Sequence, residues 1–220
     1  ADREVVSMGS RARIIAGDAD DAAMDWATGL LVDLERCWSR FRPDSELSEL
    51  NASAGRWFPM STNLAAAVDR AMALHTLTGG RFDPRILDTL EFLGYDRTFR
   101  EIRAEGSAAG PAHSPGPLDP ASMTTAIERD GTWIRLPVGT RFDLGGIGKG
   151  LAADLVAEGL LARGSTSVCV SMGGDIRAAG DAPEGGWLIP VDDPRRPGEV
   201  LGRVAVAGRA IVTSTTAFRR

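Results

Sequence analysis

The stretch that decides the fold is Asp143-Leu144-Gly145-Gly146-Ile147-Gly148-Lys149-Gly150, which separates an apolar run at 134–142 from a helical pattern at 151–163. The apolar run predicts a strand, and a glycine loop between a strand and a helix start directs backbone N–H groups toward an anion. Lys149 lies in the first turn of the expected helix, where the helix dipole disfavours a cation. The stretch therefore predicts a negatively charged ligand, and phosphate is the first candidate.

Two common phosphate-binding loops do not match this spacing. The P-loop pattern GxxxxGK[ST] needs a glycine where Asp143 stands and a hydroxyl where Gly150 stands. The dinucleotide pattern GxGxxG fails because Gly146-Ile147-Gly148 is followed by Lys149-Gly150-Leu151. Glycines alone fit a tight turn with positive φ equally well. Asp143 and Lys149 favour a ligand site over a simple turn.

The composition is that of an ordinary globular protein. The chain has 220 residues, of which 43% are hydrophobic and 25% charged, with a net charge of −5. This length allows one domain over 1–220, and the charge favours neither nucleic acid nor an anionic membrane surface as a partner. No apolar run reaches the roughly 18 to 20 residues of a membrane span. No signal peptide is visible in this chain, which leaves the compartment undetermined and favours a cytoplasmic location slightly over an exported lipoprotein.

Cysteine and histidine give little support for a metal or catalytic site. Cys37 and Cys169 lie among apolar neighbours and are expected to be buried free thiols. His75 falls late in a predicted amphipathic helix, and His113 falls in a loop rich in proline, glycine and serine. Neither histidine is favoured as a catalytic base.

The order of predicted elements favours an α+β fold, with antiparallel-rich mixed sheets covered by helices. Expected strands lie at 5–15 with a bulge at Met8-Gly9, around a hairpin at Gly139-Thr140, and at 166–172, 187–191, 202–207 and 210–214. Expected helices lie at 20–41 with a stripe of Trp26, Leu30, Leu34 and Trp38, at 46–51, from Ser61 or Thr62 to Gly79-Gly80, and at 151–163. A mobile loop is expected at 104–120, where small residues and proline predominate.

Three further segments are open to two interpretations each. Gly173-Gly174-Asp175 follows a predicted strand and suits either a close backbone approach to a ligand or a β-turn. Phe41 follows a helix end, where a core position is favoured over a ring that stacks on a ligand. Phe82-Asp83-Pro84 suits a helix start with a buried aromatic side chain.

Taken in order, these segments resemble the ApbE family, the FAD:protein FMN transferases. The matching pieces are Met8-Gly9-Ser10, 41–51 (FRPDSELSELN), 80–84 (GRFDP), 143–150 (DLGGIGKG), 170–175 (VSMGGD) and 211–220 (IVTSTTAFRR). The intervals between them also fit, and together they cover essentially the whole chain. Several ordered motifs are far more specific than one glycine loop.

The resemblance implies an ApbE-like architecture related to the T-fold, FAD as substrate and Mg²⁺ as cofactor. It implies that the FMN half of FAD moves to a threonine or serine hydroxyl of a flavin-accepting target protein, with release of AMP. It implies that the backbone carbonyl of Gly146 is a ligand of the metal. The residues that it assigns to FAD are Met8, Phe41, Arg81, Phe82, Asp83, Asp143, Lys149, Gly173, Gly174 and Asp175.

One departure from the family pattern concerns the end of the chain. Family members continue into a segment that supplies the side-chain metal ligands, and this chain stops at Arg220. We therefore expect the remaining metal ligands and the catalytic residues beyond Arg220. The alternatives are a Mg²⁺-dependent FAD pyrophosphatase, with water as acceptor, and a non-catalytic flavin-binding relative.

Overall fold

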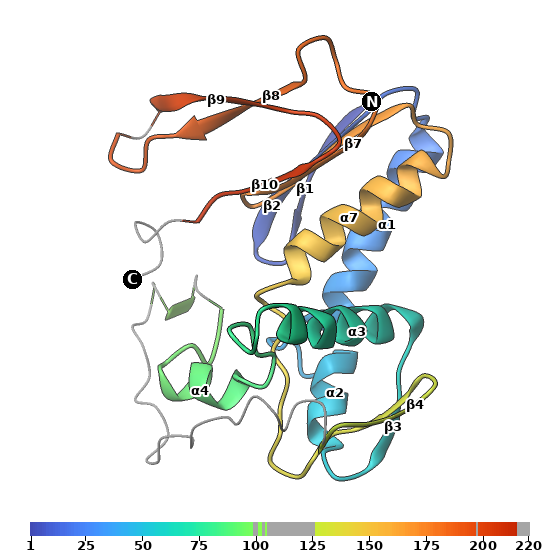
Figure 1. Cartoon of the computed structure of the whole chain (residues 1–220), viewed down its shortest axis with the longest axis vertical. Coiled ribbons are helices and arrows are strands. Elements are labelled where there is room, and N and C mark those ends of the chain that lie inside the picture. Colours follow the sequence, from blue (N-terminus) through green and yellow to red (C-terminus); the bar gives the residue numbers. More distant parts are fainter. Residues whose placement is uncertain (99–100, 103, 105–125, 197, 215–220) are drawn as a thin grey trace. The chain divides into compact units, whose positions relative to one another are not determined.

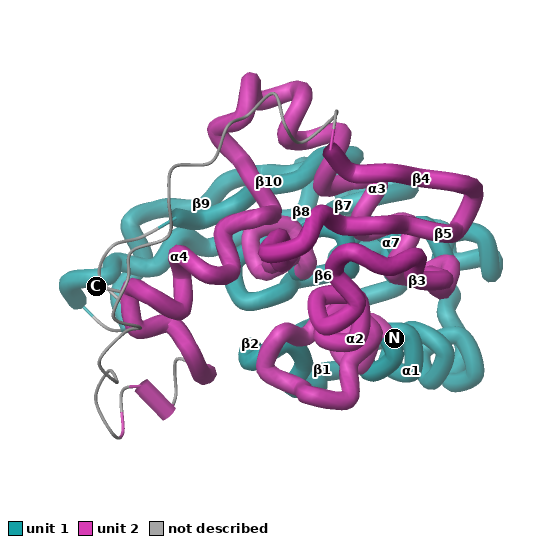
Figure 2. Tube along the Cα trace, turned by 90° about the horizontal axis from the view of Figure 1, so that it is seen from below, with its two compact units in different colours: residues 1–33, 149–220 teal, residues 34–148 magenta. Residues whose placement is uncertain are grey.

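The structure is a computed structural model, and it describes residues 1–98, 101–102, 104, 126–196 and 198–214. The chain folds into two compact units, of which unit 1 is 1–33 with 149–220 and unit 2 is 34–148 (Figure 2). It thus leaves unit 1 within its first long helix and returns at the glycine loop. The expectation of one domain over 1–220 stays a prediction. The predicted loop at 104–120 and His113 lie outside the described residues, except for Ala104.

Unit 1 contains a five-stranded antiparallel sheet in the order β1-β2-β6-β7-β10 (Figure 1). Its strands are β1 (Asp2–Ser7), β2 (Ser10–Ala16), β6 (Ser167–Met172), β7 (Asp175–Gly180) and β10 (Ala210–Val212). Alternate residues of the central strands are almost fully buried, among them Ile14 and its partner Val170. The alternation of side chains along a strand gives this sheet one core face.

Two helices cover that core face. They are α1 (Asp21–Trp38), which begins in unit 1 and ends in unit 2, and α7 (Gly148–Leu161). Ser7 of β1 donates a hydrogen bond to the carbonyl of Leu31 in α1, at 3.3 Å. Trp26 of α1 packs on Gly159 of α7, where a Cβ would lie only 1.9 Å from the indole ring. A separate antiparallel ribbon of β8 (Trp187–Asp192) and β9 (Val200–Val206) completes the described part of unit 1.

Unit 2 packs helices with a small three-stranded sheet in the order β3-β5-β4. Besides the end of α1, the elements that the structure describes in it are α2 (Glu46–Ala52), β3 (Trp57–Pro59), α3 (Thr62–Leu77), α4 (Leu87–Phe92), β4 (Glu128–Asp130) and β5 (Trp133–Arg135). Ser45 and Ser61 cap α2 and α3, because each hydroxyl accepts a backbone N–H three residues on. The fully buried side chains include Leu47, Leu64 and Phe142.

The predicted mixture of helices and antiparallel strands is confirmed, and three local predictions are wrong. Met8-Gly9 is a two-residue hairpin turn instead of a bulge, since Ser7 pairs with Ser10 and both turn residues have positive φ. The hairpin predicted at Gly139-Thr140 turns instead at Gly131, between β4 and β5. The apolar run is not one strand, because β5 ends at Arg135 and Pro137 has no N–H for a strand ladder.

The buried stripe of α1 also differs from the predicted one. The predicted positions are four residues apart, and a helix with 3.6 residues per turn drifts by about 40° at each such step. Leu34 and Trp38 are buried as predicted, but Trp26 and Leu30 are only half-buried. In the first half of the helix the buried positions are instead Met24, Ala27 and Leu31, at steps of three and four residues. Among the described residues, no helix has the length and apolar character that a membrane span requires.

Candidate functional site

Unit 2 contains a pocket of about 330 Å³ beside the glycine loop. Its volume lies at the lower end of the range found for small-molecule sites. The pocket is lined by Gly80, Arg81, Phe82, Asp83, Ile86, Asp143 and Gly146. Five of the residues that the resemblance assigned to FAD or the metal therefore meet in one place.

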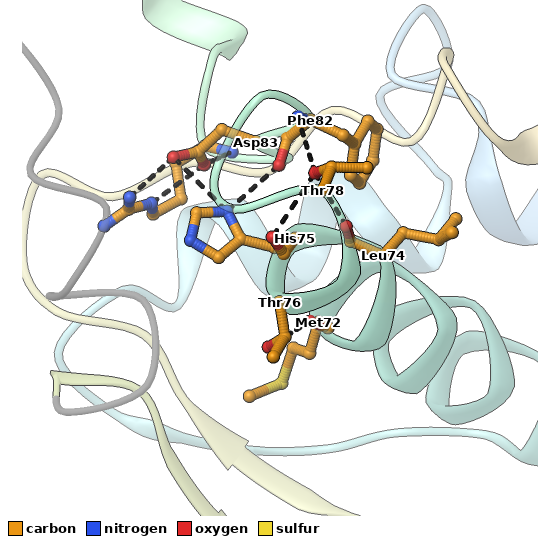
Figure 3. A network of polar contacts seen from close by, with 8 residues as sticks. Met72, Leu74, His75, Thr76, Thr78, Phe82 and Asp83 are labelled. Atoms are coloured by element: carbon orange, nitrogen blue, oxygen red, sulfur yellow. Dashed lines mark hydrogen bonds and ion pairs between the residues drawn. The ribbon is translucent and has the colours of Figure 1, made fainter.

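The segment that carries Phe82 into the pocket is fixed by the end of α3. Gly79 and Gly80 follow the helix with φ of 60° and 78°, a conformation that glycine adopts without strain. The N–H of Phe82 donates to the hydroxyl of Thr78 at 3.0 Å, and His75 Nδ1 lies 3.0 Å from the carbonyl oxygen of Phe82 (Figure 3). Because a carbonyl only accepts, Nδ1 of His75 must carry the proton. His75 is thus a buried positioning residue.

Asp83 forms a buried ion pair with Arg85. Arg85 Nε and the Arg85 backbone N–H both donate to Asp83 Oδ1 at 2.9 Å, and an Arg85 Nη donates to Oδ2 at 2.6 Å. Burial alone would raise the pKa of Asp83, but the hydrogen bonds and charge of Arg85 outweigh it and lower the pKa. The carboxylate therefore stays ionised, and most of its acceptor capacity is used by Arg85.

Asp143 is held in the pocket by three contacts of its own and by the hydrogen bonds that fix the residue before it. Asn51 donates to the carbonyl of Phe142 at 2.9 Å and accepts the N–H of Phe142 at 2.7 Å, which fixes the preceding residue. The N–H of Asp143 donates to the carbonyl of Pro84 at 2.7 Å. Its Oδ1 accepts the N–H of Gly145 at 2.9 Å, and its Oδ2 lies 2.8 Å from Nε of Arg40.

Gly146 leaves the wall of the pocket open. A Cβ at this position would lie 3.2 Å from the ring of Phe82, tighter than an ordinary contact. Across the described part of the chain, no group of three or more histidine, cysteine, aspartate or glutamate side chains is placed to hold a metal ion. The assignment of the Gly146 carbonyl to a metal stays a prediction.

Five other predicted residues lie in unit 1, around the turns at one end of its sheet. Gly173 and Gly174 form the two-residue turn between β6 and β7, both with positive φ, so their β-turn interpretation is confirmed. A Cβ on Gly173 would lie 2.6 Å from Oγ of Ser10 and 3.7 Å from Cδ of Lys149. The hairpin turn at Met8 precedes Ser10 directly, so Met8, Gly173 and Lys149 belong to the same end of unit 1.

Asp175 and Lys149 occupy the positions that the sequence predicts. Lys149 is the second residue of α7, so a cation does stand in the first turn of this helix. Asp175 is the first residue of β7 and lines a small pocket of about 80 Å³ together with Asp154 and Arg177. Arg177 Nε lies 3.2 Å from Oδ1 of Asp154, so these two residues form an ion pair beside the pocket.

Phe41 corrects the prediction of a core position. The residue is 45% exposed, and the guanidinium of Arg40 lies 4.3 Å from the centre of its ring. The ring follows the end of α1 at Trp38, whose indole Nε1 donates to the carbonyl of Asn63 at 3.0 Å. Trp38 therefore closes the end of the helix, and this leaves Phe41 on the surface of unit 2.

Sequence reasoning missed three residues that shape the pocket in unit 2, namely Arg40, Asn51 and Arg85. Arg85 stands two residues after Asp83, a spacing that gives a short-range signal for an Asp–Arg pair. Asn51 lies 91 residues before Phe142 in the chain, and Arg40 lies even farther from Asp143. Nothing in the sequence alone connects positions so far apart.

The model of the ApbE family matches residues 8–220 of this chain. The chain belongs to the ApbE family. Among its curated relatives, the FAD:protein FMN transferase of Treponema pallidum is 27% identical over 227 residues, which cover 90% of this chain and 58% of that protein. The FAD:protein FMN transferase of Haemophilus influenzae is 28% identical over 184 residues, which cover 77% of this chain and 50% of that protein. This ApbE chain thus spans about half the length of the curated relatives it matches.

Solved ApbE structures share the fold. The ApbE protein of Thermotoga maritima superposes with a TM-score of 0.76 at 20% identity, over 96% of this chain and 68% of that one. The flavin transferase ApbE of Vibrio cholerae gives a TM-score of 0.75 at 23% identity, over 100% and 72%. The predicted ApbE-like α+β architecture is therefore confirmed.

Proposed function

We propose that this ApbE chain is the FAD-binding part of a Mg²⁺-dependent FMN transferase that acts on a threonine or serine hydroxyl of a target protein. The observation that carries the proposal is the pocket of unit 2, where Arg81, Phe82, Asp83, Asp143 and Gly146 lie together. The names of the curated relatives support the same activity.

The chemistry of the pocket suits a nucleotide. Phe82 offers an aromatic surface to a planar ring, and exposed Arg81 offers a cation to a diphosphate. Asp143 is 6% exposed and can accept a hydrogen bond from a sugar hydroxyl or a ring N–H. Gly146 adds a backbone that a ligand can approach closely, because no side chain stands between them.

The proposed reaction is a phosphoryl transfer. The acceptor hydroxyl oxygen bonds to the phosphorus of the FMN half, the bond from that phosphorus to the bridging oxygen breaks, and AMP leaves while the hydroxyl proton is released. In such reactions the protein contributes mainly positioning and charge stabilisation. A histidine base is unnecessary, which agrees with a buried, hydrogen-bonded His75.

Mg²⁺ fits the described residues only in part. From the predicted set they offer the carbonyl of Gly146, since the carboxylate of Asp143 already contacts Arg40 and Gly145. When bound, Mg²⁺ would neutralise charge on the phosphoryl oxygens, and it commonly takes its ligands from a few carboxylates and substrate phosphates. The other ligands stay a prediction.

Unit 1 supports an anion-binding role for its own predicted residues. Lys149 stands where the helix dipole disfavours a cation, and a Cβ on Gly173 would lie 3.7 Å from Cδ of Lys149, so the turn between β6 and β7 lies beside this side chain. We therefore propose Met8, Lys149, Gly173, Gly174 and Asp175 as further FAD contacts.

The test incubates the full-length protein with FAD, Mg²⁺ and a peptide that carries an acceptor threonine, and follows the peptide by mass spectrometry. The expected product is an FMN–peptide adduct with one AMP released per adduct, and none forms with EDTA or with a threonine-to-valine peptide. AMP and free FMN without adduct would indicate a pyrophosphatase. Bound FAD without turnover would indicate a flavin-binding protein, and either result would overturn the transferase proposal.

A further inference from the structure

Arg40 contacts two predicted FAD-binding residues of unit 2 at once. Its Nε lies 2.8 Å from Oδ2 of Asp143, and its guanidinium carbon lies 4.3 Å from the ring centre of Phe41. The sequence motifs contain Phe41 and Asp143 but not Arg40. A residue outside the motifs thus joins two residues that belong to different motifs.

The ion pair is buried, so Arg40 has little freedom to leave it. The side chains of Arg40 and Asp143 are 10% and 7% exposed. Burial lowers the pKa of Arg40, whereas the negative charge of Asp143 opposes that change. Removing one member of a buried pair leaves the other charge without compensation, which is strongly unfavourable. The position of the guanidinium is therefore fixed by Asp143.

A fixed guanidinium in turn restrains the ring of Phe41. A cation over an aromatic ring is attracted to its face, and a planar guanidinium also stacks on it. Phe41 is nevertheless 45% exposed, so part of the ring stays available to a ligand. Loss of Arg40 would remove this contact from the exposed ring.

We propose that Arg40 is a positioning residue that couples the carboxylate of Asp143 to the ring of Phe41. For FAD binding this rests on the proposed function, because Asp143 and Phe41 are assigned to FAD there. The coupling implies that loss of either Arg40 or the charge of Asp143 disturbs the same arrangement. A lysine at position 40 would restore the ion pair but not the flat stacking surface.

The coupling itself is tested without ligand. Full-length protein with 4-fluorophenylalanine at position 41 is observed by ¹⁹F NMR as wild type, Asp143→Asn and Arg40→Met. We expect both substitutions to move or broaden the signal of residue 41. The control is Asp69→Asn, which removes a carboxylate 2.8 Å from Arg129 elsewhere in unit 2 and is expected to leave the signal unchanged. An unchanged signal in Asp143→Asn would overturn the proposal.

Its effect on binding is tested by titration of flavin fluorescence in a double-mutant cycle. Arg40→Met and Asp143→Asn are each expected to weaken FAD binding about tenfold, and the double variant scarcely more than either, because contacting residues are not additive. Arg40→Lys is expected to fall between wild type and Arg40→Met. Arg42→Met, which removes an exposed partner of Asp44, is the control with unchanged affinity.

The two proposals fail in different ways. Fully multiplicative losses in the double variant, or an Arg40→Met variant that folds and binds FAD like wild type, would overturn the coupling and leave the proposed function intact. A wild-type protein that binds no FAD would refute the proposed function, while the ¹⁹F comparison still decides the coupling. Thermal unfolding of each variant identifies any that fails to fold. If Arg40→Met fails to fold, Arg40→Lys replaces it in the comparison.

Discussion

The side-chain amide of Asn51 in α2 forms two hydrogen bonds with the backbone of Phe142, one as donor at 2.9 Å and one as acceptor at 2.7 Å. The two residues are 91 positions apart in the chain. Phe142 is fully buried, and Asp143 follows it into the pocket. Asn51 therefore fixes the backbone position from which the side chain of Asp143 reaches the pocket.

Asn51→Ala is expected to destabilise the protein by about 1–3 kcal/mol, because it leaves a buried N–H and C=O of Phe142 without partners. FAD affinity should fall as well. Urea unfolding and flavin titration measure the two effects. Asn63→Ala removes an amide of the same size in the first turn of α3 and should change the free energy of unfolding by less than about 0.5 kcal/mol. Equal effects of the two substitutions would contradict the role of Asn51.

Gly146→Ala is expected to weaken FAD binding about tenfold without unfolding the protein. The added Cβ would lie 3.2 Å from the ring of Phe82 and would narrow the pocket. Gly150→Ala is the control in the same motif, since a Cβ there meets nothing within 4 Å. Isothermal titration calorimetry measures the affinity of both variants for FAD. An unchanged affinity in Gly146→Ala would show that FAD does not contact the pocket at Gly146.

Gly159→Ala is expected to destabilise unit 1 by about 1–3 kcal/mol through overpacking. A Cβ on Gly159 would lie 1.9 Å from the indole of Trp26, which is itself pinned by the guanidinium of Arg163 at 3.5 Å from its ring centre. Gly29→Ala in α1 is the matched control, because nothing lies within 4 Å of its added Cβ. It should stabilise by about 0.5–1 kcal/mol through helix propensity. The two substitutions should therefore shift the midpoint of thermal unfolding in opposite directions, which differential scanning calorimetry measures.

Arg85→Met is expected to lower the free energy of unfolding by about 3–5 kcal/mol at neutral pH, because it leaves the buried carboxylate of Asp83 without its guanidinium partner. The pKa of Asp83 is lowered from its ordinary 3.8 in the folded protein. The ionised carboxylate of Asp83 therefore stabilises the folded protein above pH 3.8, and this stabilisation is lost as the pH falls through the folded-state pKa. The difference between wild type and Arg85→Met should shrink in acid.

The control for Arg85 is Arg13→Met. Arg13 pairs with Asp2 on the surface of unit 1, where the side chains are 51% and 48% exposed. Such exposed pairs contribute about 0–1 kcal/mol. Chemical unfolding at neutral and acidic pH compares the two variants, and a cost for Arg85→Met as small as that for Arg13→Met would show that burial adds nothing to the Asp83 pair.

Cys37 is expected to resist alkylation in the folded protein at about pH 8 and to react after unfolding. Burial, and then the hydrogen bond from its thiol to Glu46 at 3.1 Å, raise the pKa of Cys37 from 9.0 to about 12. The unfolded chain therefore releases this proton first, so stability falls as the pH rises from about 9 to 12. Cys37→Ser should show a weaker alkaline loss, measured by urea unfolding at neutral and alkaline pH.

The contradicting outcome for Cys37 is rapid labelling of the native protein. Cys169 is an internal comparison, because burial also raises its pKa and its thiol is likewise free. Neither thiol should react before unfolding. Mass spectrometry of peptides distinguishes the two positions.

Several parts of the fold were predictable because their causes are local. Ser61 caps α3 with its own hydroxyl, and Gly79 ends that helix because it adopts positive φ without strain. Strand β6 was predictable from its run of buried apolar residues, in which Val168 and Val170 are β-branched. The hairpin at Met8 was harder to predict, since a methionine with φ of 51° departs from the usual turn residues.

The sequence by itself determined the family, because ordered motifs such as 80–84 and 143–150 keep their residues and intervals wherever they fold. It also determined most helices, whose period and caps are local properties. Only the tertiary structure decided that Arg81, Phe82, Asp83, Asp143 and Gly146 line one pocket, and that Arg40 and Asn51 hold Asp143 there. These contacts join residues far apart in the chain. Packing in three dimensions sets such contacts, and no local propensity encodes them.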